Sequence, residues 1–182
     1  MSENFHKNVN KVEKLSIKFL SFLSIVSIYF FLILVPLEPI ANSGGSVGGY
    51  SSSLGDGNDC TSCHSGVVNS GTGNAQFSTN IPVSGYVPGQ TYTITCLVTI
   101  TSSATSLYTV FGFEATSEDD SNNKVGTFLI TDTNNTQLVN SNNSVTHTLQ
   151  GANSLFVNAH SWTFDWIAPN CGTGDVTFYN SS

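Results

Sequence analysis

Hydrophobic and polar residues alternate in short runs along the second half of the chain, and Gly, Pro, Asn and Asp separate the runs. The alternation is clearest in residues 92–98 and 162–166. A period of two places every second side chain on the same face of a strand. Trp162, Phe164 and Trp166 therefore share one face, and a second layer must cover it.

We predict seven strands from these runs, because each is short, rich in β-branched and aromatic residues and bounded by turn residues. Their ranges are 75–81, 91–101, 107–116, 125–131, 145–149, 162–167 and 175–179. No sustained helical period follows residue 44. Seven short strands with regular turns predict an all-β domain, a two-sheet sandwich over residues 75–182. The strands continue almost to Ser182, which leaves open whether a closing strand is missing.

The first 43 residues have a different pattern. Four lysines within the first eighteen residues precede an apolar run over 19–37, and the small residues Ala41 and Ser43 follow it. A positive head, an apolar middle and a small-residue exit indicate a signal peptide over 1–43, so we expect a periplasmic, cell-surface or secreted protein. An uncleaved membrane anchor is the alternative, because about 17 apolar residues can just span a bilayer.

Residues 44–74 form a Gly- and Ser-rich segment that contains Cys60-Thr61-Ser62-Cys63-His64, and its first part, residues 44–59, predicts a flexible lead-in or linker. Cys-X-X-Cys-His is the attachment pattern of c-type haem. The thiols bond the porphyrin, and the histidine supplies an axial ligand to the iron. We therefore predict haem c on Cys60 and Cys63 with His64 as the proximal ligand. A short Cys60–Cys63 disulfide and half of a zinc site are the alternatives.

The remaining cysteines and histidines suggest two further features. Met1 is the only methionine and would leave with the signal, so a distal haem ligand would be His147 or His160, or the position is open. Both histidines share strand parity with apolar neighbours, so parity does not choose between them. Cys96 and Cys171 are left over. In an oxidising compartment we expect a structural disulfide between them, with two free buried thiols as the alternative.

Charge narrows the class of partner. From residue 44 onward, nine acidic residues and one lysine, Lys124, give a formal charge of −8. Such a surface repels phosphate backbones and anionic lipids, so nucleic acid is disfavoured and only the N-terminal segment would meet a membrane. The acidic run 118–123 lacks the ligand spacing of an EF-hand, so we interpret it as a solvated turn, with Lys124 beside it charged and solvated.

Several short motifs, in the same order, resemble those of the choice-of-anchor V domain of bacterial exported proteins, which is related to the reelin-type (Reeler) domain. They occupy residues 55–57, 60–66, 88–94, 111–114, 126–128, 145–148, 161–166 and 174–179. The resemblance implies an immunoglobulin-like sandwich and a surface or secreted location. The histidine of the family's Thr-His-Thr motif matches His147, which favours His147 over His160 as the distal ligand.

Two functional hypotheses follow. The first is an exported monohaem c-type cytochrome-like module that transfers electrons to a redox partner protein. The second is a haem-free extracellular adhesion or surface-interaction domain, in which Cys60 and Cys63 form a disulfide. An enzyme has little support, because the sequence shows neither Ser-His-Asp spacing nor paired carboxylates in a recognisable setting.

Overall fold

The computed structural model describes residues 22–24, 26, 42–101, 110–153 and 158–182. The chain divides into two compact units, 1–39 and 40–182. The described residues of the first unit are helical, and no helix among the described residues is long and apolar enough to cross a membrane. The prediction of a signal peptide or anchor over 1–43 lies almost entirely outside the described residues.

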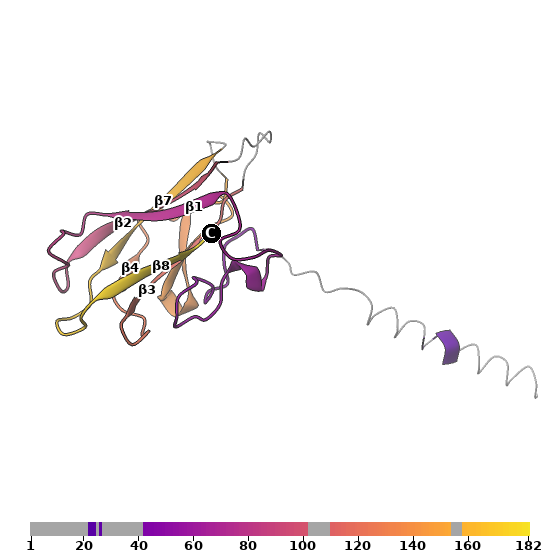
Figure 1. The fold of residues 1–182 in the computed structure, drawn as a ribbon, viewed down its shortest axis with the longest axis horizontal. Helices are drawn as coiled ribbons and strands as arrows, with labels where there is room; N and C mark the ends of the chain where they lie inside the picture. The colour runs from indigo at the N-terminus through magenta and orange to yellow at the C-terminus, as the bar shows by residue number, and fades with distance from the viewer. Residues whose placement is uncertain (1–21, 25, 27–41, 102–109, 154–157) are drawn as a thin grey trace, which may run out of the picture. The chain divides into compact units, whose positions relative to one another are not determined.

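The second unit is a sandwich of two antiparallel four-stranded sheets (Figure 1), which confirms the predicted all-β fold. The first sheet has the order β1 (Gly73–Thr79), β2 (Thr91–Ile100), β7 (Ala159–Ile167) and β4 (Thr127–Leu129). The second has the order β5 (Thr136–Val139), β6 (Ser144–His147), β3 (Glu114–Asp119) and β8 (Val176–Ser181). Two short 3-10 turns are η1 (Cys60–Ser62) and η2 (Asn140–Asn142).

The core lies between the two sheets and follows the alternation of the sequence. In β7, Trp162, Phe164 and Trp166 are buried, as their shared parity predicted. Phe113, which precedes β3, stacks on Trp162 from the other sheet with ring centroids 4.4 Å apart. Each fully buried large side chain of this kind contributes about 1.5–3 kcal/mol of transfer free energy. The aromatic residues of β7 and their partners therefore hold the two sheets together.

One predicted strand is displaced in the structure, and one observed strand was not predicted. The strand predicted over 107–116 is described from residue 110 onward, and the observed β3 begins only at Glu114 and continues to Asp119. Strand β5 was missed, because Asn and Asp surround it and resemble a turn. Glu118 lies inside β3 and is fully buried, so the interpretation of the whole acidic run as a solvated turn is wrong. Polar residues form a buried strand here because another segment covers their face.

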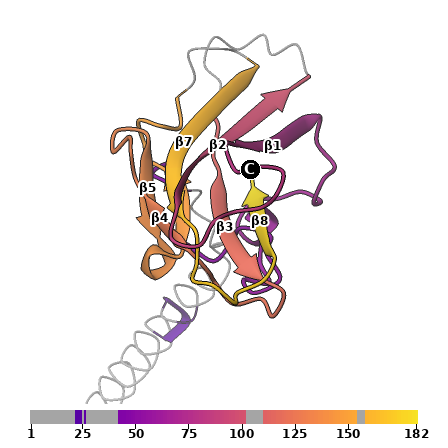
Figure 2. The same cartoon turned by 90° about the vertical axis from the view of Figure 1, so that its left-hand side faces the viewer.

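That covering segment is residues 42–59, which we call the N-terminal coil. It lies against β3 and β8 in both cartoon views (Figures 1 and 2), and its Ser51 and Ser53 are 0% and 3% exposed. Gly45 has φ 113°, and an added Cβ there would lie 2.3 Å from the His147 carbonyl oxygen. The coil therefore needs glycine to approach the sheet. The prediction that residues 44–59 are a flexible lead-in is wrong.

Candidate functional site

The Cys-X-X-Cys-His motif forms the short turn η1 beside the end of β8. Asp59 caps the turn, because its carboxylate accepts a hydrogen bond from the Thr61 amide at 2.7 Å. The Cys60 sulfur lies 2.7 Å from the Ser181 hydroxyl, and burial raises the pKa of this half-buried thiol. Cys63 and His64 are exposed. The motif thus has one half-buried thiol, one exposed thiol and one exposed imidazole.

The other two histidines of the sandwich point into its interior. His147 is 8% exposed, and its Nδ1 accepts a hydrogen bond from the Phe113 amide at 3.1 Å. The Nε2 atom of His160 lies 2.8 Å from the Gly151 carbonyl oxygen. Burial lowers the pKa of both imidazoles. Both rings are therefore neutral core groups near pH 7, on the faces that strand parity predicted.

The structure does not bring His147 toward the Cys-X-X-Cys-His motif. Cys60 contacts Ser181, which pairs across the strands with Glu114, and the N-terminal coil covers Glu114 on the outer face of this sheet. The His147 ring packs near Trp162, on the inner face of the same sheet. A macrocycle held at Cys60 would have to enter the packed core to meet His147 or His160.

The predicted Cys96–Cys171 disulfide is not formed in the structure, where all four cysteines are free. Cys96 is buried in β2, its sulfur lies 3.3 Å from the Asn180 side-chain oxygen, and burial raises its pKa to about 12. Cys171 is exposed in the turn that precedes β8. One thiol thus faces the core, whereas the other faces solvent.

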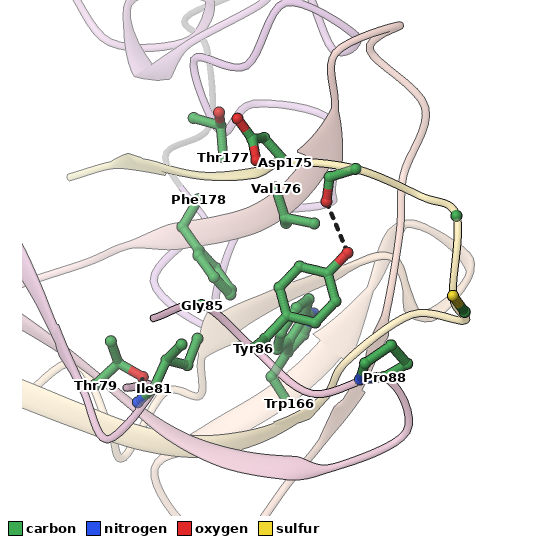
Figure 3. A pocket seen from close by; sticks show the side chains of 13 residues that line it. Thr79, Ile81, Gly85, Tyr86, Pro88, Trp166, Asp175, Val176, Thr177 and Phe178 are labelled. Carbon is green, nitrogen blue, oxygen red and sulfur yellow. Dashed lines mark hydrogen bonds between the residues drawn. The ribbon is translucent and has the colours of Figure 1, made fainter. Parts of the chain in front are cut away.

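A groove of about 790 Å³ opens between the β1–β2 turn and the β7–β8 turn (Figure 3). Tyr86 lies across it and donates a hydrogen bond from its hydroxyl to the Gly174 carbonyl at 2.7 Å. The Tyr86 and Trp166 rings form a T-shaped pair with centroids 5.8 Å apart, and the Trp166 and Phe178 rings form another with centroids 4.9 Å apart. Asp175 is exposed in the lining. Sequence reasoning missed this site, because its residues come from two distant turns and from the strands β1, β7 and β8.

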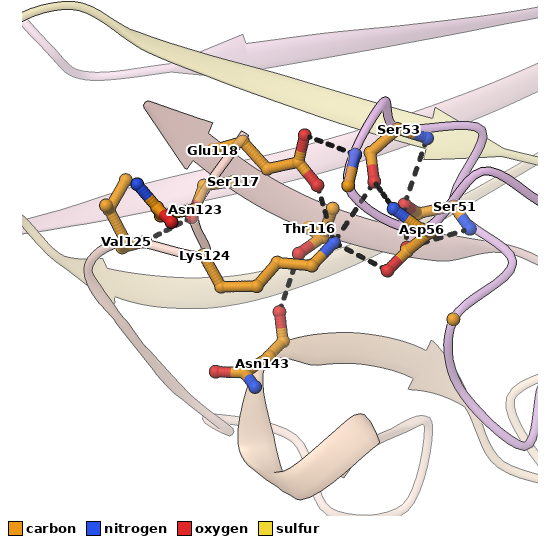
Figure 4. A network of polar contacts seen from close by, with 12 residues as sticks. Ser51, Ser53, Asp56, Thr116, Ser117, Glu118, Asn123, Lys124, Val125 and Asn143 are labelled. Carbon is orange, nitrogen blue, oxygen red and sulfur yellow. Dashed lines mark hydrogen bonds and ion pairs between the residues drawn. The ribbon is translucent and has the colours of Figure 1, made fainter. Parts of the chain in front are cut away.

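A second candidate site, made of polar side chains, lies under the N-terminal coil (Figure 4). The Lys124 ammonium nitrogen is 2.7 Å from a carboxylate oxygen of Asp56 and 2.7 Å from one of Glu118. Burial alone would raise the pKa of both carboxyls, but hydrogen bonds, led by those of Lys124, and its positive charge lower both pKa values. The Lys124 side chain is only 18% exposed, so the prediction of a solvated lysine is wrong.

A third carboxylate, Glu114, holds the coil without any lysine. It accepts hydrogen bonds from the amides of Gly49 at 2.8 Å and Tyr50 at 3.2 Å and from the Ser46 hydroxyl. Glu114 and Glu118 lie on the same face of β3, four residues apart, as a period of two requires. That spacing is the one sequence signal that could have revealed a buried polar face.

The sequence and the fold were compared with known proteins. The Reeler domain family matches residues 58–181. Two crystal structures of the human F-spondin reeler domain are each 24% identical to this chain. The match to the first covers 57% of this chain and 72% of the F-spondin chain, with TM-score 0.41. The match to the second covers 63% of this chain and 77% of the F-spondin chain, with TM-score 0.45. The Reelin-N domain of F-spondin is 26% identical, with coverages of 57% and 69% and TM-score 0.40. No curated protein matches.

The family match overturns the first functional hypothesis. The matched family is a β-sandwich domain, and the match includes Cys60, Cys63 and His64 together with all eight strands. The prediction of a c-type cytochrome-like electron-transfer module is therefore wrong, and the alternative of a haem-free domain fits better. Taken by itself, the five-residue Cys-X-X-Cys-His pattern predicts haem attachment. The family of the domain that contains it overrules that prediction.

Proposed function

Because this chain belongs to the Reeler domain family, we propose that it is an exported, haem-free surface-interaction domain. The observation that carries the proposal is the extent of the family match, which runs from residue 58 to residue 181 and includes the Cys-X-X-Cys-His motif. The signal-like pattern of residues 1–43 supports export. The motifs between residues 55 and 179 support placement among the choice-of-anchor V domains.

The groove of Figure 3 is the recognition surface in this proposal. Aromatic rings with a few polar groups at the rim are typical of binding sites. From residue 44 onward the only basic residue is Lys124, which is held between two carboxylates under the coil. The surface charge is therefore negative, and Asp175 adds to it in the groove. Such a site suits a basic peptide segment, whose cations would contact Asp175 and the face of Tyr86.

Binding of a fluorescent Lys-rich peptide, measured by anisotropy at low and high salt, tests the proposal. Tyr86→Ala and Asp175→Asn should each weaken binding several-fold, and salt should weaken binding to the wild type more than to Asp175→Asn. Thr163→Ala, on the exposed outer face of β7 and outside the groove lining, is the matched control. Equal affinity in the wild type and both groove variants would rule out this site.

In the haem-free domain we propose that Cys60 and Cys63 pair with each other after export. The Cys63 amide donates a hydrogen bond to the Cys60 carbonyl at 3.2 Å, so a single turn separates the two residues. Exported proteins meet an oxidising environment in which neighbouring thiols form disulfides. Such a bond would brace the junction between the N-terminal coil and the sandwich.

A further inference from the structure

Lys124, Asp56 and Glu118 form a triad with more than one ion pair. A single ammonium nitrogen is 2.7 Å from both carboxylates, and the two acidic side chains are 4% and 0% exposed (Figure 4). Lys124 is the only lysine after residue 18. One carboxylate would suffice to neutralise it, and burying a second one is costly. A nucleophilic amine, a carboxyl group and a second carboxylate thus meet in a place from which most water is excluded.

We propose that this triad forms an amide bond between the Lys124 side-chain nitrogen and the Asp56 side-chain carbon, with Glu118 as the proton carrier. Lysine amines are nucleophiles when they lose their proton beside a base. The proposal is independent of what the groove binds, because the triad and the groove lining share no residue.

The geometry favours attack on Asp56. With Nζ 2.7 Å from one oxygen of Asp56, the carboxyl carbon lies within about 4 Å of the nitrogen, close to the roughly 3–3.5 Å of a near-attack arrangement. The other oxygen of Asp56 accepts hydrogen bonds from the hydroxyl and the amide of Ser51. Donors placed at that oxygen stabilise the negative charge that develops on it when the amine adds.

The reaction needs no co-reactant. The ground state is the ion pair, as the lowered pKa values of Asp56 and Glu118 indicate. The Lys124 ammonium gives one proton to Glu118 across 2.7 Å, and the free amine then adds to the Asp56 carbon. A second proton leaves the nitrogen, both protons reach one Asp56 oxygen, and that oxygen departs as water. The new C–N bond replaces a C–O bond, and Glu118 ends as a carboxylate again.

The contacts of Glu118 suit it to carry protons and not to form the amide bond with Lys124. One of its oxygens accepts a hydrogen bond from the Gly55 amide at 3.1 Å, and the other accepts one from Lys124. The hydroxyl and amide donors of Ser51 serve Asp56 alone. A bond to Asp56 also has a structural consequence, since it ties the N-terminal coil covalently to the β3–β4 turn. An exported domain gains resistance to unfolding and proteolysis from such a link, as it would from a disulfide.

The test is the intact mass of the mature, reduced protein, with its N-terminus established by peptide mapping. The expected mass is one water below the mass of the sequence, and proteolysis should yield a branched peptide that joins residues 56 and 124. A mass equal to that of the sequence, with the two peptides separate, would leave only an ion pair and overturn the proposal. A branch at Glu118 would overturn the assignment to Asp56.

Three variants test the chemistry. Lys124→Arg keeps a cation but cannot form the bond, so its mass should equal that of its sequence. Glu118→Gln keeps the shape but carries no proton, so the uncrosslinked form should accumulate. Asp56→Asn should lose ammonia in place of water and give a product of the same mass as the wild-type product. A water loss that persists in Lys124→Arg would place the reaction elsewhere and refute the triad.

Discussion

Glu114 is the residue whose replacement tests most directly how the N-terminal coil is held. Its two carboxylate oxygens accept three hydrogen bonds from the coil, and the side chain is 1% exposed. In Glu114→Gln one oxygen remains, while the amide group that replaces the other presents hydrogens to donors. When the remaining oxygen accepts the hydrogen bond from the Gly49 amide, the Ser46 hydroxyl and the Tyr50 amide lose the oxygen that accepted theirs.

The expected cost follows from these contacts. Hydrogen bonds to a charged group contribute about 1.5–3 kcal/mol each, and a buried donor left without a partner costs about 1–3 kcal/mol. The Ser46 hydroxyl can turn to another acceptor, whereas the Tyr50 amide cannot. We therefore expect Glu114→Gln to reduce the free energy that holds the coil in place by about 2–4 kcal/mol.

Hydrogen exchange separates this local effect from global unfolding. The Gly49 and Tyr50 amides should exchange roughly 30-fold to 1000-fold faster in Glu114→Gln, because each 1.4 kcal/mol is about a factor of ten. The measurement is best made in a Lys124→Arg background, so that a covalent tie at Asp56 does not hold the coil. Unchanged exchange at both amides would refute the role of Glu114. Asp165→Asn, which changes a half-buried carboxylate on the outer face of β7, should leave the exchange of both amides unchanged.

Two further predictions concern titration and thiol chemistry. Burial lowers the pKa of His147 and His160, so the folded state favours the neutral rings. The stability of the fold should therefore fall as the pH drops below 6.5, the ordinary pKa of histidine. The urea midpoint measured against pH reports this fall, and His147→Gln should flatten the pH dependence. Alkylation of the unreduced mature protein should label the exposed Cys171 at once and Cys60 and Cys63 only after reduction, whereas labelling of that pair without reduction would exclude their disulfide.

The sequence alone determined the sandwich and its inner face. Residues 92–98 and 162–166 alternate strictly, and a period of two leaves only one way to bury Trp162, Phe164 and Trp166. The same local rule placed His147 on the inner face. The motifs between residues 55 and 179 were enough to indicate the related family. These features depend on near neighbours in the chain, which is why a one-dimensional pattern contains them.

Only the tertiary structure decided which polar residues are buried. Glu118 and Lys124 stand in a run that resembles a solvated turn, and the Gly/Ser-rich coil resembles a linker, because neither pattern records that they cover each other. Their burial depends on hydrogen bonds between residues more than sixty positions apart. The Cys-X-X-Cys-His pattern has the same limit: the five residues predict haem attachment by themselves, and the domain around them decides what the pattern serves.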